Sequence, residues 1–317
     1  MSTAVQQLEQ EIQQQLGRVL FGMEKTIHGL CVALIAQGHV LLEGPPGLGK
    51  TLLAKSLAKI LRGEFKRIQC TADMMPSDLT GIHIYDDKNS EFKLLPGPLF
   101  SDVVLVDEIN RTGPKTQSSL LQAMEEGVIT LDRKSYDLPE NFFLMASQNP
   151  FDFEGVYPLP ESQLDRFLLR LQLDYPVVDT EMEVLQHYDK PGGGHAGSDM
   201  SFTPLTEGLL EKAKAQVNAV HVSEGLYRYV AEIAKASRSE PRLSLGLSTR
   251  GALALMLCAR IEAASQGRDY VVPDDVKKIA PEITAHRFVL TPEATLEDTD
   301  CVQIYLDIVS RITVPRD

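Results

Sequence analysis

The segment from Gly44 to Thr51 contains the residues whose types and spacing most clearly predict a chemistry. It fits the phosphate-loop pattern G-x-x-x-x-G-K-[ST] at every fixed position, reading Gly44-Pro45-Pro46-Gly47-Leu48-Gly49-Lys50-Thr51 with Leu52 next. Glycines let the backbone curl so that successive N–H groups point inward at phosphates. The Lys50 ammonium can reach the β and γ phosphate oxygens, and the Thr51 hydroxyl can ligate Mg2+. The segment therefore predicts a site for a nucleoside triphosphate.

Two acidic residues, Asp107 and Glu108, follow directly after an apolar run at residues 103–106. Such a run is typical of a central strand buried on both faces, and ligands collect at the carboxyl ends of parallel strands. We expect Asp107 to hold the metal through water, and Glu108 to orient and polarise the attacking water. The alternative is that the two acids simply end a strand, but the phosphate loop upstream favours the catalytic interpretation.

A third predicted strand, at residues 142–147, ends in Gln148, Asn149 and Pro150. This places the Asn149 amide at the same edge of the sheet, where it could sense the γ-phosphate. An Asn before Pro is also an ordinary turn residue. Only its position in the series of strands favours the functional interpretation.

Residues 159–170 predict a helix that carries Arg166 and Arg170 one turn apart. Phosphoryl transfer concentrates negative charge on the γ oxygens, and an arginine supplied from outside the loop can raise the rate by roughly 10³ to 10⁵. One of the two is therefore a candidate for serving a neighbouring subunit. They could equally be surface cations near a helix end, and their spacing does not decide between the two interpretations.

The elements around these residues have the patterns that a phosphate site needs. Residues 39–43 predict a buried strand entering the loop, and residues 50–61 have helical apolar spacing leaving it. Two hairpins are also predicted, at residues 82–94 and 127–138, because apolar residues alternate around a polar turn. Either hairpin could also be a surface decoration.

The phosphate loop, the two acids after a strand, the Asn149 segment and the arginine segment follow one another in an order that resembles the AAA+ ATPases. Longer stretches are similar to the MoxR family in particular. Those stretches are residues 44–51, 95–100, 107–111, 115–127, 148–150 and 157–167. The resemblance spans nearly the whole chain. It implies an α/β fold, with a P-loop core whose central parallel sheet is flanked by helices, β-hairpin insertions, and a C-terminal all-α lid domain.

The resemblance also implies a role for each site residue. The Walker A residues are Lys50 and Thr51, the Walker B residues are Asp107 and Glu108, sensor 1 is Asn149, and the finger that acts in trans is Arg166. A second sensor is implied at Arg250, which would reach the γ-phosphate of its own subunit. Its Ser and Thr neighbours are equally what any helix start shows.

ATP and Mg2+ are the expected ligands. The chain lacks an N-K-x-D guanine reader, and the resemblance packs the base against residues 19–23. Phe21 and Gly22 lie in that segment and are expected to bind the nucleotide, although Phe21 could equally be a core residue. The expected reaction is hydrolysis of ATP to ADP and phosphate.

The composition is that of a soluble protein of two domains, and we expect it in the cytoplasm. With 317 residues, 43% of them hydrophobic, the chain is long enough to form two cores. The four cysteines are far apart and include no C-x-x-C, which argues against disulfides and zinc. The longest apolar run, residues 30–36, is too short to cross a bilayer, and no signal-peptide pattern is visible, so we expect no membrane insertion.

We predict a nucleotide-binding core at residues 1–188, a Gly-rich linker at residues 189–200 and a lid at residues 201–317. The linker matches G-x-G-x-x-G, but Pro191 and the polar residues around it do not fit the strand and helix that a dinucleotide site needs. Helical patterns predict the all-α lid, at residues 205–220, 224–237, 249–265, 273–286 and 298–312.

Three classes of function follow from an ATPase of this kind. The MoxR resemblance implies a chaperone, forming a homohexameric ring, that matures or loads metal into a partner with a von Willebrand factor A domain. A nucleic-acid motor is the second class, but 31 Lys plus Arg against 44 Asp plus Glu give a net charge of −13, which repels a phosphate backbone. The third is a subunit of a metal-chelatase motor, which the sequence does not exclude.

Overall fold

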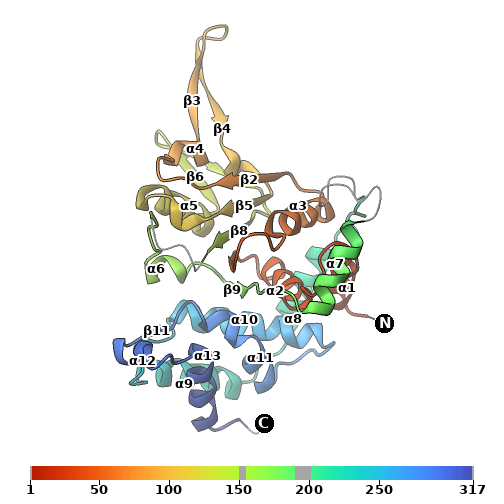
Figure 1. Cartoon of the computed structure of the whole chain (residues 1–317), viewed down its shortest axis with the longest axis vertical. Helices are drawn as coiled ribbons and strands as arrows, with labels where there is room; N and C mark the ends of the chain where they lie inside the picture. The colour runs from red at the N-terminus through yellow and green to blue at the C-terminus, as the bar shows by residue number, and fades with distance from the viewer. Residues whose placement is uncertain (1, 150–154, 190–200, 316–317) are drawn as a thin grey trace.

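A five-stranded parallel sheet forms the centre of the computed structural model, which describes residues 2–149, 155–189 and 201–315 (Figure 1). The strand order is β2-β5-β8-β1-β9. The strands are β1 (Val40–Glu43), β2 (Phe65–Gln69), β5 (Val103–Asp107), β8 (Phe143–Gln148) and β9 (Leu169–Gln172). The phosphate loop follows β1, the two predicted catalytic acids end or follow β5, and Asn149 follows β8. The parallel arrangement therefore brings the predicted site residues to one edge of the sheet.

Both faces of the sheet are buried by helices, which explains why the strands are continuous apolar runs. Val40 and Leu42 of β1 contact one apolar cluster, whereas Leu41 contacts another. The first cluster includes α1 (Ala4–Leu16), α2 (Glu24–Ile35) and α3 (Lys50–Leu61), and the second includes α5 (Pro114–Glu126). The predicted α/β core with its central parallel sheet is confirmed.

The prediction of one helix over residues 159–170 is wrong. A short helix, α6 (Glu161–Leu164), is followed by a turn and then by the edge strand β9. Leu169 and Leu171 are buried while Gln172 is exposed, so this segment has the two-residue period of a strand. Arg170 consequently lies on the sheet, where it pairs with Glu43 and donates to the Ala285 carbonyl at 3.0 Å.

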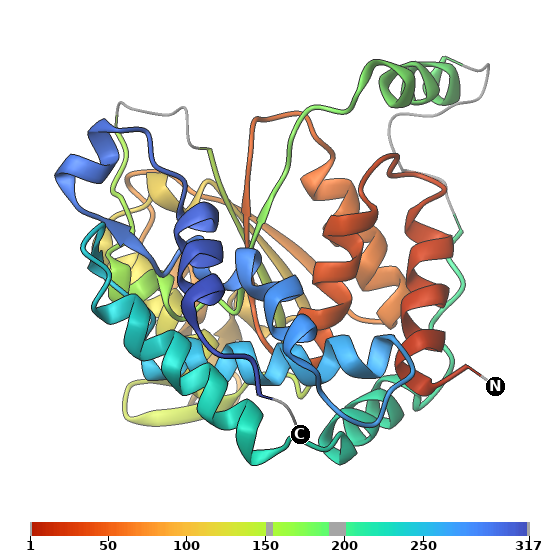
Figure 2. The same cartoon turned by 90° about the horizontal axis from the view of Figure 1, so that it is seen from below.

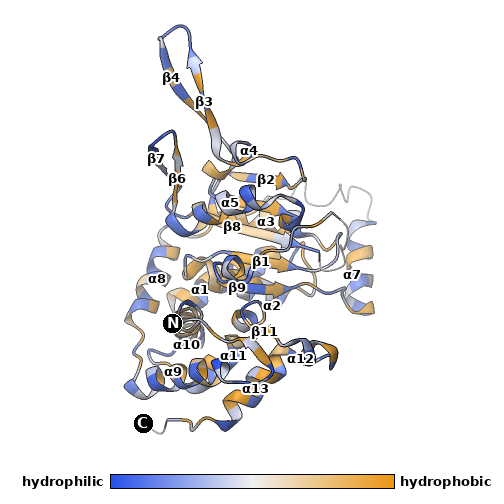
Figure 3. Ribbon diagram, turned by 90° about the vertical axis from the view of Figure 1, so that its left-hand side faces the viewer, coloured by the Kyte–Doolittle hydropathy of each residue, from blue (hydrophilic) through white to orange (hydrophobic). Residues whose placement is uncertain are grey.

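Two hairpins project from the same end of the core, as the sequence predicts (Figures 1 and 3). They are β3 (Gly81–Asp86) with β4 (Glu91–Pro96), and β6 (Val128–Leu131) with β7 (Lys134–Asp137). The short helix α4 (Pro76–Thr80) and the 3-10 turns η1 (Pro98–Phe100) and η2 (Ile109–Arg111) lie between these core elements in the chain. His83 of β3 contacts Asp132 at 2.8 Å and Tyr136 at 2.9 Å, so side chains join the two hairpins.

The C-terminal part is helical, as predicted. Its helices are α8 (Leu209–Ala219), α9 (Glu224–Arg238), α10 (Thr249–Ser265), α11 (Pro273–Thr284), α12 (Pro292–Leu296) and α13 (Cys301–Arg311). It also contains one small antiparallel pair, β10 (Leu243–Leu245) with β11 (Val289–Leu290). None of the helices formed by the described residues is long and apolar enough to cross a membrane.

The N-terminal helix α1 packs against the C-terminal part as well as against the core (Figure 2). The Val5 amide donates to Gln216 of α8 at 3.1 Å, and the Gln6 side chain donates to the Ser265 carbonyl of α10 at 3.1 Å. The helix α7 (Val178–Tyr188) lies at the edge of the molecule. Residues 190–200 of the predicted linker lie outside the described residues.

A partly buried network of charged side chains also joins the two parts. The carboxylate of Glu262, on α10, is fully buried and contacts His28 of α2 and Lys278 of α11 at 2.5 Å each. His28 contacts Glu9 of α1 at 3.3 Å as well. Burial by itself lowers the pKa of His28, but the hydrogen bonds to Glu262 and Glu9 outweigh it and raise the pKa to about 9. His28 is therefore a cation at neutral pH and holds two carboxylates from different helices.

Candidate functional site

A cavity of about 390 Å³ lies where the phosphate loop meets the ends of β2, β5 and β8. Its lining residues are Gly44, Pro46, Gly47, Gly49, Lys50, Thr51, Leu52, Lys55, Arg67, Gln69, Asp107, Glu108, Ser147 and Asn149. Most of the predicted loop residues, both acids and the predicted sensor are therefore brought together. Pro45 is buried, and Leu48 packs against the apolar core, so these two support the loop from behind.

The conformation of the loop explains its glycines. A Cβ on Gly44 would lie 2.2 Å from the Leu173 carbonyl oxygen, so the backbone of the loop passes too close to the chain after β9 for any side chain. Gly47 and Gly49 have φ angles of +87° and +77°, a region that other residues rarely adopt. Gly49 is also the residue before α3, so the unpaired N–H groups of that helix face the cavity and favour an anion there.

The Lys50 ammonium donates a hydrogen bond to the Gly44 carbonyl at 2.6 Å, which holds it across the loop. Burial lowers the pKa of Lys50, while the nearby carboxylates of Asp107, Glu108 and Glu43 act in the opposite direction. A triphosphate would supply further negative charge and so favour the charged ammonium.

Asp107 is fixed by two neighbours. The Ser147 hydroxyl donates to Asp107 Oδ1 at 2.9 Å, and Arg67 Nε donates to Asp107 Oδ2 at 2.7 Å. The Ser147 oxygen in turn accepts the Glu108 amide at 3.0 Å. Asp107 therefore has a fixed orientation at the end of the central strand.

Glu108 has a backbone φ of +56°, in the left-handed region that non-glycine residues seldom adopt. Such a conformation costs free energy and persists at sites where the side chain must point in a particular direction. The Glu108 carboxylate accepts from Gln69 Nε2 at 3.0 Å and pairs with Arg111 Nε at 3.0 Å, through the same oxygen Oε2.

The residues present fit a magnesium ion. Mg2+ prefers hard oxygen ligands and keeps several waters, so one hydroxyl and one carboxylate from the protein are sufficient. The Thr51 hydroxyl and the Asp107 carboxylate both line the cavity. Asp107 already holds the guanidinium of Arg67, which shows that this carboxylate attracts a cation.

Arg166 and Arg250 do not line this cavity. Both pair with the same carboxylate, Glu125 at the end of α5, and the Arg166 Nε to Glu125 Oε2 distance is 3.2 Å. The expectation that Arg250 reaches the phosphates of its own subunit is therefore not met in this structure. The physical reason is the docking of α10, since Ser248 Oγ before that helix donates to Asp165 Oδ2 at 2.9 Å beside α6.

We call the surface formed by Glu125, Arg166 and Arg250 the arginine surface. It is supported by Arg287, which is buried and donates to Asp165 Oδ1 at 2.7 Å and to the Phe167 carbonyl at 2.6 Å. The structure thus brings the two predicted arginines together, but neither of them lines the phosphate-loop cavity.

Phe21 and Gly22 do not line the cavity either. The Phe21 ring packs against His187 of α7, with ring centroids 5.3 Å apart. Gly22 faces Thr180 of the same helix, 3.0 Å from where a Cβ would lie. The preceding Leu20 is closer to the loop, since its side chain lies 3.3 Å from the Cβ position of Gly49.

Sequence reasoning missed Arg67, Gln69, Arg111 and Ser147, which surround the two acids. A signal for two of them was present, because Arg67 and Gln69 alternate near the end of a strand and so share one face of it. No motif marked that strand. Its pairing with β5, in which Gln69 is opposite Asp107, is a long-range contact that the local pattern does not contain.

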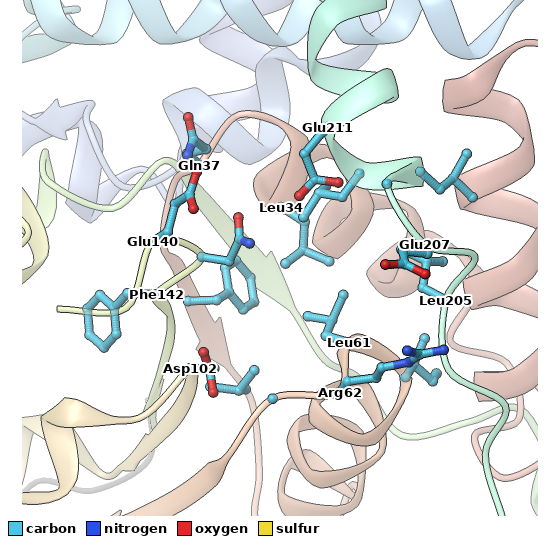
Figure 4. Close-up of a pocket in the computed structure, with 18 of the residues that line it drawn as sticks. Leu34, Gln37, Leu61, Arg62, Asp102, Glu140, Phe142, Leu205, Glu207 and Glu211 are labelled. Carbon is cyan, nitrogen blue, oxygen red and sulfur yellow. The ribbon is translucent and has the colours of Figure 1, made fainter.

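A second cavity, of about 210 Å³, lies at the opposite edge of the sheet, near the starts of β5 and β8 (Figure 4). Its charged lining is Arg62, Asp102, Glu140, Glu207 and Glu211. Four carboxylates and one guanidinium give this cavity a negative potential, which disfavours a triphosphate.

Comparisons with known proteins agree with this geometry. Residues 39–169 match the ATPase family associated with various cellular activities, and residues 235–304 match the AAA lid domain. The Bacillus subtilis protein YeaC is 43% identical over 95% of this chain and 92% of its own. The chaperone MoxR1 of Mycobacterium tuberculosis is 34% identical over 94% of this chain and 80% of its own.

A crystal structure from Cytophaga hutchinsonii has the same fold, with a TM-score of 0.86 and 35% identity, and covers 98% of this chain and 96% of that protein. The family matches cover the phosphate loop, both acids, Arg166 and Arg250. With the parallel sheet, the helical lid and relatives above 30% identity over nearly all of its length, the chain belongs to the MoxR family of AAA+ ATPases.

Proposed function

We propose that this protein is a chaperone that hydrolyses ATP in a ring of identical subunits, each active site being completed by the next subunit. The observation that carries the proposal is the separation of Arg166 and Arg250 from the phosphate loop. The cavity has a phosphate loop and two acids, and the two arginines lie together on a different surface. A neighbouring copy would supply them.

In the proposed reaction, the loop amides and Lys50 bind the phosphates of ATP. Glu108 orients the attacking water and accepts its proton, and Asn149 contacts the γ-phosphate. Arg166 of the neighbouring subunit stabilises the charge that develops on the transferred phosphoryl group. Thr51 and Asp107 would hold Mg2+, which supplies charge neutralisation for the phosphates.

The proposed client is a protein with a von Willebrand factor A domain, which the ring remodels, matures or loads with metal. The MoxR resemblance of the sequence supports this class of client, and the relative MoxR1 is named a chaperone. The β3-β4 hairpin, which projects from one end of the core, is the natural surface for contacting a client, because Ile82, Tyr85 and Phe92 are exposed on it.

The charge of the chain disfavours a nucleic-acid motor. The net charge is −13, and Lys93 of the β3-β4 hairpin is already paired with Asp86 at 2.6 Å and Glu91 at 3.4 Å. A phosphate backbone would have to displace these acids. A metal-chelatase motor uses a similar ring and similar partners, and we treat it as the alternative.

The proposal is tested by measuring ATP hydrolysis against protein concentration for the wild type, Arg166→Ala and the control Arg228→Ala. Arg228 is exposed on α9 and belongs to neither the phosphate-loop cavity nor the arginine surface. We expect the specific activity of the wild type and the control to rise with concentration, and that of Arg166→Ala to collapse while it still binds nucleotide. A flat activity that does not depend on Arg166 would mean that each chain works alone.

Two further measurements distinguish a chaperone from a nucleic-acid motor. Co-purification with a von Willebrand factor A domain protein, and stimulation of the ATPase by it, would support the chaperone. Stimulation by single-stranded DNA at physiological salt would instead support the nucleic-acid motor and overturn the proposed client class.

A further inference from the structure

Arg67 lies on the edge strand β2 and bridges Asp107, the expected metal ligand, and Gln69. Its Nε donates to Asp107 Oδ2 at 2.7 Å, and its Nη2 donates to Gln69 Oε1 at 2.9 Å. The side chain is 49% exposed, so solvent is available on its other side. Arg67 is no part of the phosphate loop, yet it lines the same cavity.

The contact places a positive charge on the carboxylate that is expected to hold Mg2+. One oxygen of Asp107 accepts from the Ser147 hydroxyl, and the other accepts from Arg67. A hydrated Mg2+ and a guanidinium compete for such a carboxylate, because both are cations that bind its oxygens. The guanidinium binds through N–H donors, and Mg2+ binds through its waters or directly. The neutral Ser147 contact can remain when the metal arrives, whereas the charged Arg67 contact opposes it.

Arg67 is also linked to the proposed catalytic base. Its bond to Gln69 Oε1 leaves the amide nitrogen of Gln69 facing Glu108, to which it donates at 3.0 Å. The chain of contacts from Asp107 through Arg67 and Gln69 to Glu108 is continuous. The two contacts of Arg67 use different nitrogen atoms, so the guanidinium can leave Asp107 without releasing Gln69, and Glu108 keeps its pairing with Arg111.

We propose that Arg67 is a built-in cation that neutralises Asp107 before the metal and nucleotide bind, and that Mg2+ displaces it. Displacement leaves this oxygen of Asp107 free for the metal, so Arg67 sets part of the affinity of the site for Mg2+. The proposal rests on the Mg2+ and ATP site of the proposed function. It assigns Arg67 a positioning role, because Arg67 acts through Asp107.

The test measures metal binding directly. Mn2+ replaces Mg2+ at oxygen sites and has an electron paramagnetic resonance signal, so free Mn2+ can be titrated against the protein with a non-hydrolysable ATP analogue present. The variants are Arg67→Gln and the control Lys66→Gln. Lys66 is the neighbouring cation on the same strand, but it points to the other face and pairs with Glu64 at 2.8 Å.

We expect Arg67→Gln to bind Mn2+ about twofold to fivefold more tightly than the wild type, the size of effect expected for a half-exposed ion pair. Lys66→Gln should match the wild type. Unchanged or weaker Mn2+ binding in Arg67→Gln overturns the proposal, as does equal tightening in Lys66→Gln, which would make the effect one of net charge. Thermal unfolding of both variants confirms that they are folded.

The outcome is separable from that of the proposed function. If the wild type binds neither the analogue nor Mn2+, the ATP site itself is wrong and the Arg67 proposal falls with it. If the wild type binds both and Arg67→Gln binds Mn2+ no more tightly, only the Arg67 proposal falls.

Discussion

The phosphate-loop cavity and the arginine surface differ in what each contains. The cavity has backbone donors, Lys50 and two acids, gathered by the ends of adjacent strands of one sheet. The arginine surface has two guanidiniums on one carboxylate, gathered from α5, the turn after α6 and the start of α10. Each has a part of a phosphoryl-transfer site that the other lacks. This division is what we expect if, as proposed, the catalytic unit is an interface between two copies, and four experiments can break or sharpen that comparison.

The largest effect is expected from Glu108→Gln. This change keeps the shape of the side chain but removes the base, so hydrolysis should fall by roughly 10² to 10⁴ while ATP stays bound. Phosphate release and the nucleotide retained on the purified protein are the measurements. Glu126→Gln, at the exposed end of α5, is the matched control and should keep the wild-type rate. Retained turnover in Glu108→Gln would remove Glu108 as the base.

Mixing two inactive variants is the next test. Glu108→Gln has an intact arginine surface, and Arg166→Ala has an intact cavity. In a randomly assembled ring, about a quarter of the interfaces combine the cavity of an Arg166→Ala subunit with the arginine surface of a Glu108→Gln subunit, and these sites are complete. We expect an equal mixture to recover about a quarter of the wild-type ATPase. If the mixture is no more active than its parts, the two regions do not meet between subunits.

A smaller effect is expected from Glu125→Gln. It removes the carboxylate that holds Arg166 and Arg250, so the arginines no longer have to leave a charged partner to reach a phosphate. At protein concentrations where assembly is incomplete, the ATPase should rise by about twofold to fivefold, as for the loss of a partly exposed ion pair. A lower activity would instead mean that Glu125 positions the arginines productively.

The smallest effect is expected from the charged network around His28 and Glu262, which joins the lid to the core. Arg250 lies on the same lid helix as Glu262. The folded-state pKa of His28 is about 9, above the unfolded value of 6.5, so its stabilisation is fully present below pH 6.5 and is lost as pH rises toward 9. The wild-type Tm should fall by a few degrees over that range. His28→Gln should show a flatter profile, and an unchanged profile would remove His28 as the cause.

The fold and the cavity were largely predictable because their signals are local. The phosphate loop, the apolar run before Asp107 and the spacing of residues 249–265 each need only their own neighbours in the sequence, and α10 begins and ends where its pattern predicts. The predicted finger Arg166 was recognised from its family context. Its partner Glu125 was not, because that contact depends on how α5, α6 and α10 meet.

The errors have the same origin. Residues 159–170 contain leucines that fit a helical period as well as a strand period, and only pairing with β1 selects the strand at β9. The contact of Arg250 with the phosphates of its own subunit stays a prediction, and its pairing with Glu125 was not foreseen, because the sequence gives its position in a helix but not the direction in which that helix docks. Arg67 was not predicted as a site residue, because its partner Asp107 is 40 residues away in the sequence.

The β3-β4 hairpin has a mechanical consequence. Six residues on each strand give it a length of about 20 Å, so a rotation of about 10° at its base would carry the tip through about 3 Å. The base follows α4, and the Thr116 hydroxyl of α5 donates to the Met74 carbonyl just before it at 2.8 Å. The other end of α5 carries Glu125, which pairs with the two arginines. A small tilt of α5, caused by a change at the arginines, would therefore shift the tip of the hairpin by about the size of a side chain.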